Sequence, residues 1–348
     1  MPVRRLPSRT RPAAAGRHRP FREGLMIEIL TGSSLNTIQD FGRPHAMAMG
    51  VAQGGAMDRL ALSHGNLLLG NSVDAAGIEI VFFPFRVRFH AETSFAVTGA
   101  ACPATLDDLK LPRDWAIIAR PGQTLTLRAP EQGARAYLTL RGGLDVPPVL
   151  GARSTDLKGG FGGLEGRALQ KGDRLSCLPA STLCLPAAGY GLTRPCPLPP
   201  ADGTRIRVLP AAEHDVFTPE SLKTFHTASW TLTPSANRMG YRLEGQNALK
   251  LSRPLSLFSH GILPGTVQVP PAGQPIIQMM DANTCGGYPK IATVIAPDLR
   301  LLSQTVVGAP VHFETITRDE AVQIIRQEAA DLKRLATEIA TLRTQLVF

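Results

Sequence analysis

Basic residues beside glycine are the first feature of this chain that suggests chemistry. The set is Arg43, Arg141, Arg153, Arg238 and Lys290. Guanidinium, ammonium and backbone N–H groups are the donors that stabilise a carboxyl- or phosphoryl-bearing intermediate. We therefore expect these side chains to face an open cleft that binds anions. Arg141, beside Gly142 and Gly143, is the most suggestive, although an ion pair with Asp145 or Asp156 would explain it equally well.

Four carboxylates are candidates for proton transfer or for orienting a substrate amide, namely Asp40, Asp58, Asp156 and Asp281. Two of them have a structural alternative. Asp58 precedes a segment with helical apolar spacing, where a carboxylate can cap the first turn. Asp156 could accept hydrogen bonds from backbone N–H groups of its own loop.

Carboxamide and hydroxyl groups complete the candidate site. Gln39 and Gln268 could bond an amide or ureido group on both its donor and acceptor sides, or they could satisfy buried backbone. Tyr288 could supply a hydroxyl or belong to the core. Cys285 has no positioned base in view, so we do not expect a nucleophilic cysteine.

We assign one group of residues to catalysis and another to substrate binding. The catalytic group is Arg141, Asp156, Arg238, Asp281 and Lys290. The binding group is Gln39, Asp40, Arg43, Asp58, Arg153, Ser154, Gln268 and Tyr288. The eight histidines show no HExxH or other close ligand spacing, so no metal site is expected.

Sequence signatures of nucleotide binding and of self-contained hydrolysis are missing. The chain has no GxxxxGK[ST] phosphate loop, no GxGxxG after a strand and no GxSxG elbow. We therefore expect no cofactor bound by this chain alone, and any ATP to bind elsewhere. The glycine-rich GGFGGLEG at 159–166 predicts a tight loop with residues at positive φ.

Short strands must position most of these side chains. Apolar or alternating runs separated by turn residues occupy 78–81, 87–89, 94–98, 116–118, 124–127 and 136–140. A second series occupies 205–209, 229–233, 266–269, 276–280, 291–295 and 311–314. Many short strands with frequent turns are typical of barrels or sandwiches. The sequence therefore predicts a mainly β protein.

Two helices stand out from this pattern. The first begins after Asp58 and ends at Gly70-Asn71. The second runs from Arg318 to about residue 346, with apolar residues at helical spacing and a capping box of Thr317 with Glu320. We expect the second helix to pack on the body of the protein; self-association or binding of a partner is the alternative.

Composition divides the chain into four parts. Residues 1–25 hold seven arginines and one glutamate, a net charge of +6, which leaves +3 of the total +9 for residues 26–348. This head could be an artefact of an upstream start before Met26, a disordered tail, a transit peptide or an anion-binding arm. A Pro- and Gly-dense break at 179–203 separates two β-rich parts. We place the domains at 26–200 and 201–316, followed by a C-terminal helix at 317–348.

The mild charge of the folded part gives little support for nucleic-acid binding. No run of eighteen apolar residues exists, so no membrane span is expected. The five cysteines are irregularly spaced without a CxxC pair. Free thiols of this kind predict a reducing, cytoplasmic location.

Eight short blocks carry a family resemblance. They are TIQDFGRP at 37–44, GGAMD at 54–58, RGGLDVP at 141–147, LGARSTDL at 150–157, SANRMGYRL at 235–243, PGTVQVP at 264–270, GQPI at 273–276 and GGYPKIATV at 286–294. In this order they resemble the signatures of the family of 5-oxoprolinase C subunits. That family also includes biotin-dependent carboxyltransferases, allophanate hydrolase subunit 2 and antagonists of a sporulation-kinase inhibitor.

The resemblance implies two cyclophilin-like β-barrel domains with a few helices. It implies ATP-driven opening of 5-oxoproline to glutamate, shared with a homologous B subunit and an A subunit. The alternatives are a carboxyltransferase that uses carboxybiotin on a urea-like or amide substrate, and a regulatory protein that binds an inhibitor of a kinase. The chain has no Ala-Met-Lys-Met carrier motif, so any biotin would arrive on a partner.

Three positions depart from the family pattern. Asn237 and His260 stand where carboxylates are usual, and Ala282 stands where an arginine is usual. These changes would alter the local charge of a site, and with it the substrate, without affecting the fold.

Overall fold

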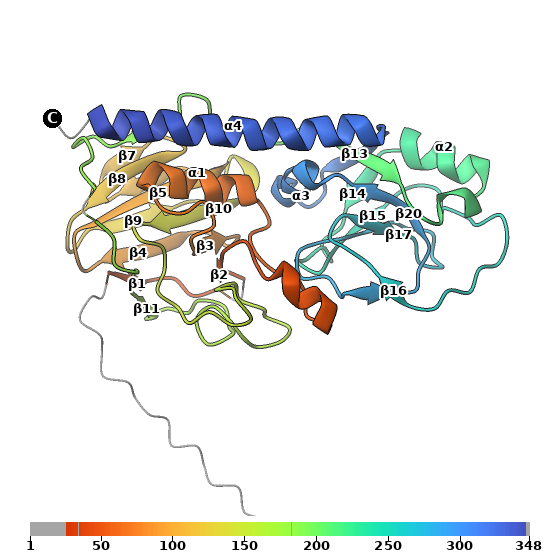
Figure 1. Ribbon diagram of the computed structural model, residues 1–348, viewed down its shortest axis with the longest axis horizontal. Coiled ribbons are helices and arrows are strands. Elements are labelled where there is room, and N and C mark those ends of the chain that lie inside the picture. Colours follow the sequence, from red (N-terminus) through yellow and green to blue (C-terminus); the bar gives the residue numbers. More distant parts are fainter. Residues whose placement is uncertain (1–25, 34, 182, 346–348) are drawn as a thin grey trace, which may run out of the picture.

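The computed structural model describes residues 26–33, 35–181 and 183–345, so the predicted arginine-rich head at 1–25 lies outside the described residues. The chain forms two β-rich halves that lie side by side (Figure 1). We call them the N-terminal half, which ends with β12 (Tyr190–Gly191), and the C-terminal half, which begins with β13 (Thr204–Pro210).

Two six-stranded sheets form the N-terminal half. The first contains, in spatial order, β11 (Arg174–Leu175), β1 (Ile27–Ile29), β4 (Phe85–Phe89), β9 (Thr124–Leu127), β6 (Ala104–Leu106) and β7 (Leu109–Leu111). The second contains β12, β8 (Trp115–Ala119), β5 (Thr93–Ala101), β10 (Gln132–Leu140), β3 (Gly77–Ile80) and β2 (Thr37–Gln39). The pairings between neighbouring strands are antiparallel.

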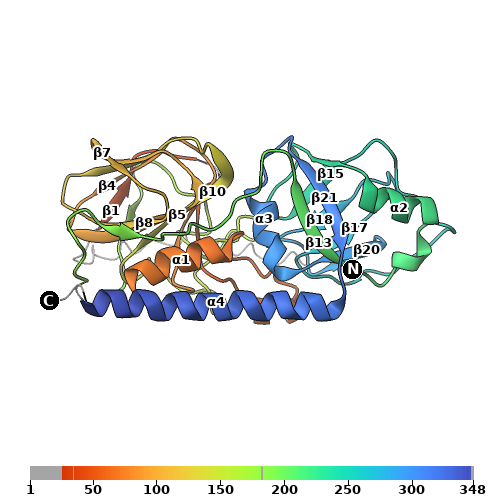
Figure 2. The same ribbon diagram turned by 90° about the horizontal axis from the view of Figure 1, so that it is seen from above.

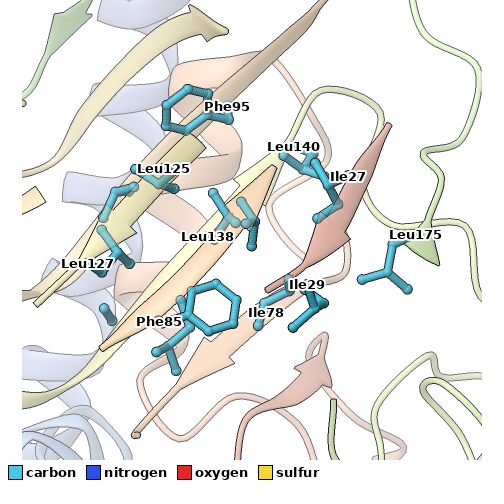
Figure 3. Packing of buried hydrophobic residues seen from close by; sticks show 14 of the residues in the cluster. Ile27, Ile29, Ile78, Phe85, Phe95, Leu125, Leu127, Leu138, Leu140 and Leu175 are labelled. Carbon is cyan, nitrogen blue, oxygen red and sulfur yellow. The ribbon is translucent and has the colours of Figure 1, made fainter. Parts of the chain in front are cut away.

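Alternating side chains explain how these sheets share one core. In β4 the sequence FRVRF buries its apolar residues and exposes its arginines, as expected for a strand with one face on a core. One apolar cluster draws residues from both sheets. Figure 3 shows Ile27 and Leu175 of the first sheet together with Leu138 and Leu140 of the second. Burying each such side chain contributes about 1.5–3 kcal/mol.

The C-terminal half is a closed barrel of seven strands. Its order is β13, β20 (Lys290–Val294), β17 (Thr266–Gln268), β18 (Ile276–Gln278), β15 (Gly240–Glu244), β14 (Trp230–Leu232) and β21 (Pro310–Thr315). The closing pair β13 and β21 is parallel. A short ribbon of β16 (His260–Gly261) and β19 (Cys285–Gly286) stands beside it.

Helix α4 (Arg318–Gln345) lies along both halves (Figures 1 and 2). Its first turn is fixed by the predicted capping box, because Glu320 N donates to Thr317 Oγ1 and Thr317 N donates to the Glu320 carboxylate. Beside it lies α1 (Arg59–Leu69) (Figure 2), and Ile339 of α4 packs into a cluster with Leu67, Leu68 and Leu69. The expected packing role of α4 is therefore confirmed.

The expectation of a mainly β chain with few helices is also confirmed. Of the two expected barrels, the closed one lies in the C-terminal half, whereas the N-terminal half consists of two sheets. Helices α2 (Pro219–Thr227) and α3 (Leu299–Gln304) were not predicted. α2 has nine residues and α3 has six, so both are shorter than the window of about 11–18 residues in which helical spacing of apolar residues is recognised.

Candidate functional site

The side chain of Arg238 joins the two halves. It lies just before β15 in the C-terminal half and donates to both carboxylate oxygens of Asp281, at 2.7 and 2.9 Å. It also donates to Glu79 of β3 at 2.5 Å and to the Gly55 carbonyl at 2.7 Å, both in the N-terminal half. Burial disfavours the guanidinium charge, but Asp281 and Glu79 outweigh it and raise the pKa of Arg238.

Glu79 is the centre of this buried network. Its carboxylate accepts hydrogen bonds from Met57 N at 2.8 Å and from the Tyr137 hydroxyl at 2.7 Å, and Arg135 lies 3.8 Å away. Burial raises the pKa of Glu79, yet Arg238 and Arg135 more than offset this and hold it below its usual value. Glu79 is therefore a buried anion with four partners rather than a proton donor.

A second polar cluster occupies the loops around Arg43. Arg43 is 2% exposed, and its Nη2 donates to the Ser154 carbonyl at 2.5 Å while its Nε donates to Val149 O at 3.3 Å. The Ser154 hydroxyl donates to Asp40, which also accepts from Arg153 N at 2.5 Å. Among the described residues, Arg43 Nη1 has no hydrogen-bond partner.

The two clusters meet at Gly54. Its N–H donates to the Met280 carbonyl at 2.8 Å, and a Cβ at this position would lie 3.2 Å from Arg43 Nη1 and 4.0 Å from Asp281 Oδ1. Burial lowers the pKa of Arg43, and Asp40, Asp156 and Asp281 oppose that shift. Predicted residues from both halves thus converge at one junction, which we call the junction cluster: Asp40, Arg43, Ser154, Asp156, Arg238 and Asp281.

An open pocket flanks this junction cluster on the N-terminal half. It has a volume of about 420 Å³ and is lined by Asp40, Arg141 and Arg153 together with glycines 142, 143 and 151. Arg141 donates to Leu69 O at 2.6 Å and to Ser181, while Arg153 Nε has no partner among the described residues. We call it the arginine pocket. It offers guanidinium groups to a small anion.

A second pocket, of about 260 Å³, opens in the C-terminal half. It is lined by Tyr288 and by four residues with carboxamide side chains, Asn237, Gln268, Gln278 and Asn283. Gln278 Nε2 donates to Gln268 Oε1 at 3.0 Å. We call it the amide pocket. Asn283 also accepts a 2.6 Å hydrogen bond from Lys158 Nζ of the N-terminal half.

Lys290 lies apart from the junction cluster. Its side chain is 5% exposed and its Nζ donates to the Tyr288 carbonyl at 3.2 Å. Glu213 lies 3.6 Å from Nζ and accepts from the Lys290 backbone N–H at 3.0 Å. His260 Nε2 lies 3.6 Å from the same carboxylate. The five predicted catalytic residues therefore do not share one cavity, because Arg141 and Lys290 lie on different halves.

Three of the predicted polar residues are engaged in structure. Asp58 caps α1 through Ala61 N at 3.0 Å and accepts from Gln304 Nε2 at 2.8 Å. Asp156 accepts from Gly159 N at 2.7 Å and holds its own loop. Gln39 donates to buried Thr155 O at 3.2 Å. For each of them the contacts support the structural role over a free functional group.

The structural alternatives expected for Tyr288 and Arg141, a core position and an ion pair, are not what their surroundings among the described residues show. Tyr288 is 48% exposed, so a core position for it is wrong. Arg141 donates to Leu69 O and to Ser181, and so holds the loop that returns over the C-terminus of α1. The expected tight loop at 159–166 is confirmed, with positive φ at Gly160, Gly162, Gly163, Glu165 and Gly166.

Sequence reasoning missed Glu79, Arg135, Tyr137 and Gln304. Gln304 accepts from the N–H groups of Ala134 and Arg135, both at 3.0 Å, so it fastens α3 to β10. The one available signal was a glutamate inside the apolar run Ile78–Val81, since a charged residue in a buried strand demands a partner.

Known proteins share this sequence over nearly its whole length. Residues 49–315 match the family model described as carboxyltransferase domain, subdomain A and B. The C subunit of the Escherichia coli 5-oxoprolinase is 42% identical over 311 residues, which cover 89% of this chain and 98% of that protein. The chain belongs to the family of 5-oxoprolinase C subunits. Its counterpart in Haemophilus influenzae is 41% identical, over 89% of this chain and 97% of that protein.

A solved structure shares the fold of this 5-oxoprolinase family member. The urea carboxylase of Kluyveromyces lactis superposes with a TM-score of 0.83 at 27% identity, over 91% of this chain and 30% of that much longer chain. In the described part of the chain, no group of histidine, cysteine, aspartate or glutamate side chains could hold a metal ion. Nor is any described helix long and apolar enough to cross a membrane.

The three departures from the 5-oxoprolinase family pattern lie near the amide pocket or the junction cluster. Asn237 lines the amide pocket and its Oδ1 accepts from Met239 N at 2.8 Å. Ala282 is buried beside Asp281. His260 faces Glu213, so a carboxylate at position 260 would lie close to another carboxylate.

Proposed function

We propose that this chain is the C subunit of an ATP-dependent 5-oxoprolinase, which opens 5-oxoproline to glutamate together with A and B subunits. The observation that carries the proposal is the 42% identity to the Escherichia coli protein over 98% of its length. That match leaves no large part of the relative without a counterpart in this chain.

The chemistry of the substrate suits the arginine pocket. 5-Oxoproline carries one carboxylate and one lactam, and ring opening breaks the lactam C–N bond. The oxygen of water joins the carbonyl carbon and its hydrogens are shared between the new carboxyl group and the nitrogen. In our proposal Arg141 and Arg153 hold the substrate carboxylate, because both line that pocket and Arg153 Nε has no partner among the described residues.

The junction cluster would position this pocket. Asp40 lines the pocket and fixes both Arg153 N and the Ser154 hydroxyl. Arg43 and Asp281 lie around Gly54 behind it, and Arg238 ties Asp281 to the N-terminal half. A residue that acts through another in this way is a positioning residue, and we propose that role for Arg43, Arg238 and Asp281.

ATP, in this proposal, is used on another subunit, and no cofactor is bound by this chain alone. The missing phosphate-loop signature supports that division of labour. The resemblance also supports cyclophilin-like architecture for both halves, domains at 26–200 and 201–316, and work in the cytoplasm, where the five free cysteines would stay reduced.

The test is a reconstitution with the three subunits purified together. Glutamate release from 5-oxoproline with ATP is measured with and without this chain, and undiminished release without it would reject the proposal. In the full complex, Arg153→Gln and Arg141→Gln should raise the KM for 5-oxoproline by about tenfold or more, because each removes one charged hydrogen-bond donor. Arg128→Gln, on an exposed arginine outside the arginine pocket, is the matched control.

A carboxyltransferase that uses carboxybiotin is the second candidate. The matching family model and the likeness to a urea carboxylase favour it. Two results together would favour this alternative. The complex would carboxylate a urea-like or amide substrate from a carrier domain bearing carboxybiotin, and it would form no glutamate from 5-oxoproline.

A further inference from the structure

A cavity of about 910 Å³ lies beneath α4. It shares no described lining residue with the arginine pocket or the amide pocket. Its walls come from the inner face of α4, from α1, from the connecting segment at 192–197, and from Arg207 and Arg300. None of these residues belongs to the junction cluster. A cavity of this size could enclose a small molecule.

One wall of the cavity is cationic. Arg300 donates Nη1 to the Pro197 carbonyl at 3.1 Å, and it forms no ion pair with a described residue. Arg194 lines the same cavity, and no hydrogen bond or ion pair joins its guanidinium to any described side chain. Two guanidinium groups thus face the cavity with donors to spare.

His64 of α1 lies in the same wall. It is 8% exposed, and its Nδ1 has no hydrogen-bond partner among the described residues. Buried polar atoms are nearly always hydrogen-bonded, so an orphaned ring nitrogen at a cavity calls for a ligand or a water. Burial together with the fields of Arg300 and Arg113 lowers the pKa of His64 to about 4, so its ring is neutral.

The opposite wall, on α4, provides one uncompensated acid. Burial raises the pKa of Glu328, the field of Arg300 opposes that shift, and Glu328 forms no ion pair within the described residues. The other charged groups at the cavity have ion-pair partners: Arg207 pairs with Asp298 at 2.5 Å, and Arg334 lies 2.7 Å from Asp331 and 3.9 Å from Glu338. Among the described residues, the cavity therefore has unpaired guanidinium groups, Arg300 and Arg194, on one wall and an unpaired carboxyl group, Glu328, on the other.

We propose that this cavity is a binding site for a free amino acid, with the carboxylate on Arg300 and the ammonium group on Glu328. Arg194 and His64 supply further polar contacts to the carboxylate end. Leu332 and Leu335 of α4 offer apolar surface to the side chain of the ligand. Helix α4 lies along both halves (Figure 2). A bound amino acid would therefore fasten α4 to the N-terminal half at α1 and to the C-terminal half at Arg300.

Calorimetric titration of the purified full-length chain tests this site without relying on hydrolysis. The probes are L-glutamate and L-leucine, with glutarate as a carboxylate without an amine. We expect saturable binding of an amino acid and about tenfold weaker binding in Arg300→Gln and in Glu328→Gln, since each removes one charged partner. Arg326→Gln, an exposed arginine on the same helix outside the cavity, should bind as the wild type does.

The arginine pocket provides the second control, because an amino acid formed by the enzyme could also bind there. Arg153→Gln must keep the binding measured by titration. The proposal is overturned if neither amino acid binds, if glutarate binds as tightly, if Glu328→Gln has no effect, or if Arg153→Gln abolishes binding. Unchanged melting temperatures of the variants show that lost binding is not lost folding.

Discussion

Arg238 and Glu79 are 159 residues apart in the chain, and their side chains join the two halves through a hydrogen bond of 2.5 Å. The Arg238 guanidinium also holds Asp281 with two further bonds, so one cation bonds an acid from each half. Both carboxylates are buried. The relative orientation of the halves therefore depends on a charge network that water does not screen.

Replacing Glu79 by glutamine tests this dependence. The variant keeps the shape of the side chain but leaves the buried Arg238 charge with one carboxylate fewer, and breaking a buried ion pair costs about 3–5 kcal/mol. We expect the free energy of unfolding, measured by urea titration, to fall by about 3 kcal/mol. Glu244→Gln, on an exposed glutamate of β15, serves as the control and should change little. Equal stability of both variants would show that the network does not hold the halves together.

Much of the junction cluster could be predicted from the sequence. Asp40, Arg43, Ser154 and Arg238 stand in the blocks that carry the family resemblance, and Asp281 lies shortly before the last of these blocks. These segments meet in space. Glu79, the partner of Arg238, lies between Ile78 and Ile80, and Gln304, which bonds Asp58 and the Arg135 carbonyl, lies in a helix of six residues. Nothing local in either segment identifies the residue of the other half that packs against it.

Contacts between distant segments also explain why the predicted catalytic residues lie in different cavities. Short strands are visible as alternation along the chain, and β4, β9 and β10 lie where the pattern places them. The alternation does not show which strand ends share a cavity, because that depends on the order of the strands in the sheet. The loop after β10 carries Arg141 and the loop before β20 leads into Lys290, and the two open on different halves.

Acid should weaken the protein through His64. Its pKa is about 4 in the folded chain and 6.5 for the free group. The unfolded chain therefore binds a proton first as pH falls, so the stability present above pH 6.5 is lost progressively toward pH 4, by about 3 kcal/mol in full. Melting temperatures at pH 7.5 and pH 5 measure the loss.

His64→Gln should remove that part of the pH dependence, because glutamine does not titrate. Exposed His45 provides a matched variant, His45→Gln, which should keep the wild-type slope between pH 7.5 and pH 5. Identical slopes for the wild type and His64→Gln would contradict the buried, neutral histidine.

Gly55 should not tolerate a side chain. It has a φ of +93°, and an added Cβ would lie 2.7–2.8 Å from backbone atoms of Phe41 and Gly42. Its carbonyl accepts from Arg238, so relief of the clash would move an acceptor of the junction cluster. We expect Gly55→Ala to lower both stability and activity of the reconstituted complex.

Gly50→Ala isolates the contribution of backbone strain. Gly50 has a φ of +79° and open space around the added Cβ, so the substitution should cost only the left-handed conformation, about 1–2 kcal/mol. Gly55→Ala should exceed that cost in the same unfolding experiment. If the two variants behave alike, the close approach of the loops is not what requires glycine at position 55.

Lys290 belongs to the predicted catalytic set, and its contacts suggest a different experiment from those on the arginines. The ammonium group lies 3.6 Å from Glu213, and both side chains are largely buried. Lys290→Met would leave Glu213 with only the backbone N–H and partly exposed His260 as partners. A double-mutant cycle with Glu213→Gln should therefore give a coupling energy of about 1–3 kcal/mol in unfolding.

The activity of Lys290→Met separates a structural from a catalytic role. If the lysine only supports the barrel, activity per folded complex stays near the wild-type value in Lys290→Met. A loss of turnover with stability unchanged would instead place Lys290 in the reaction.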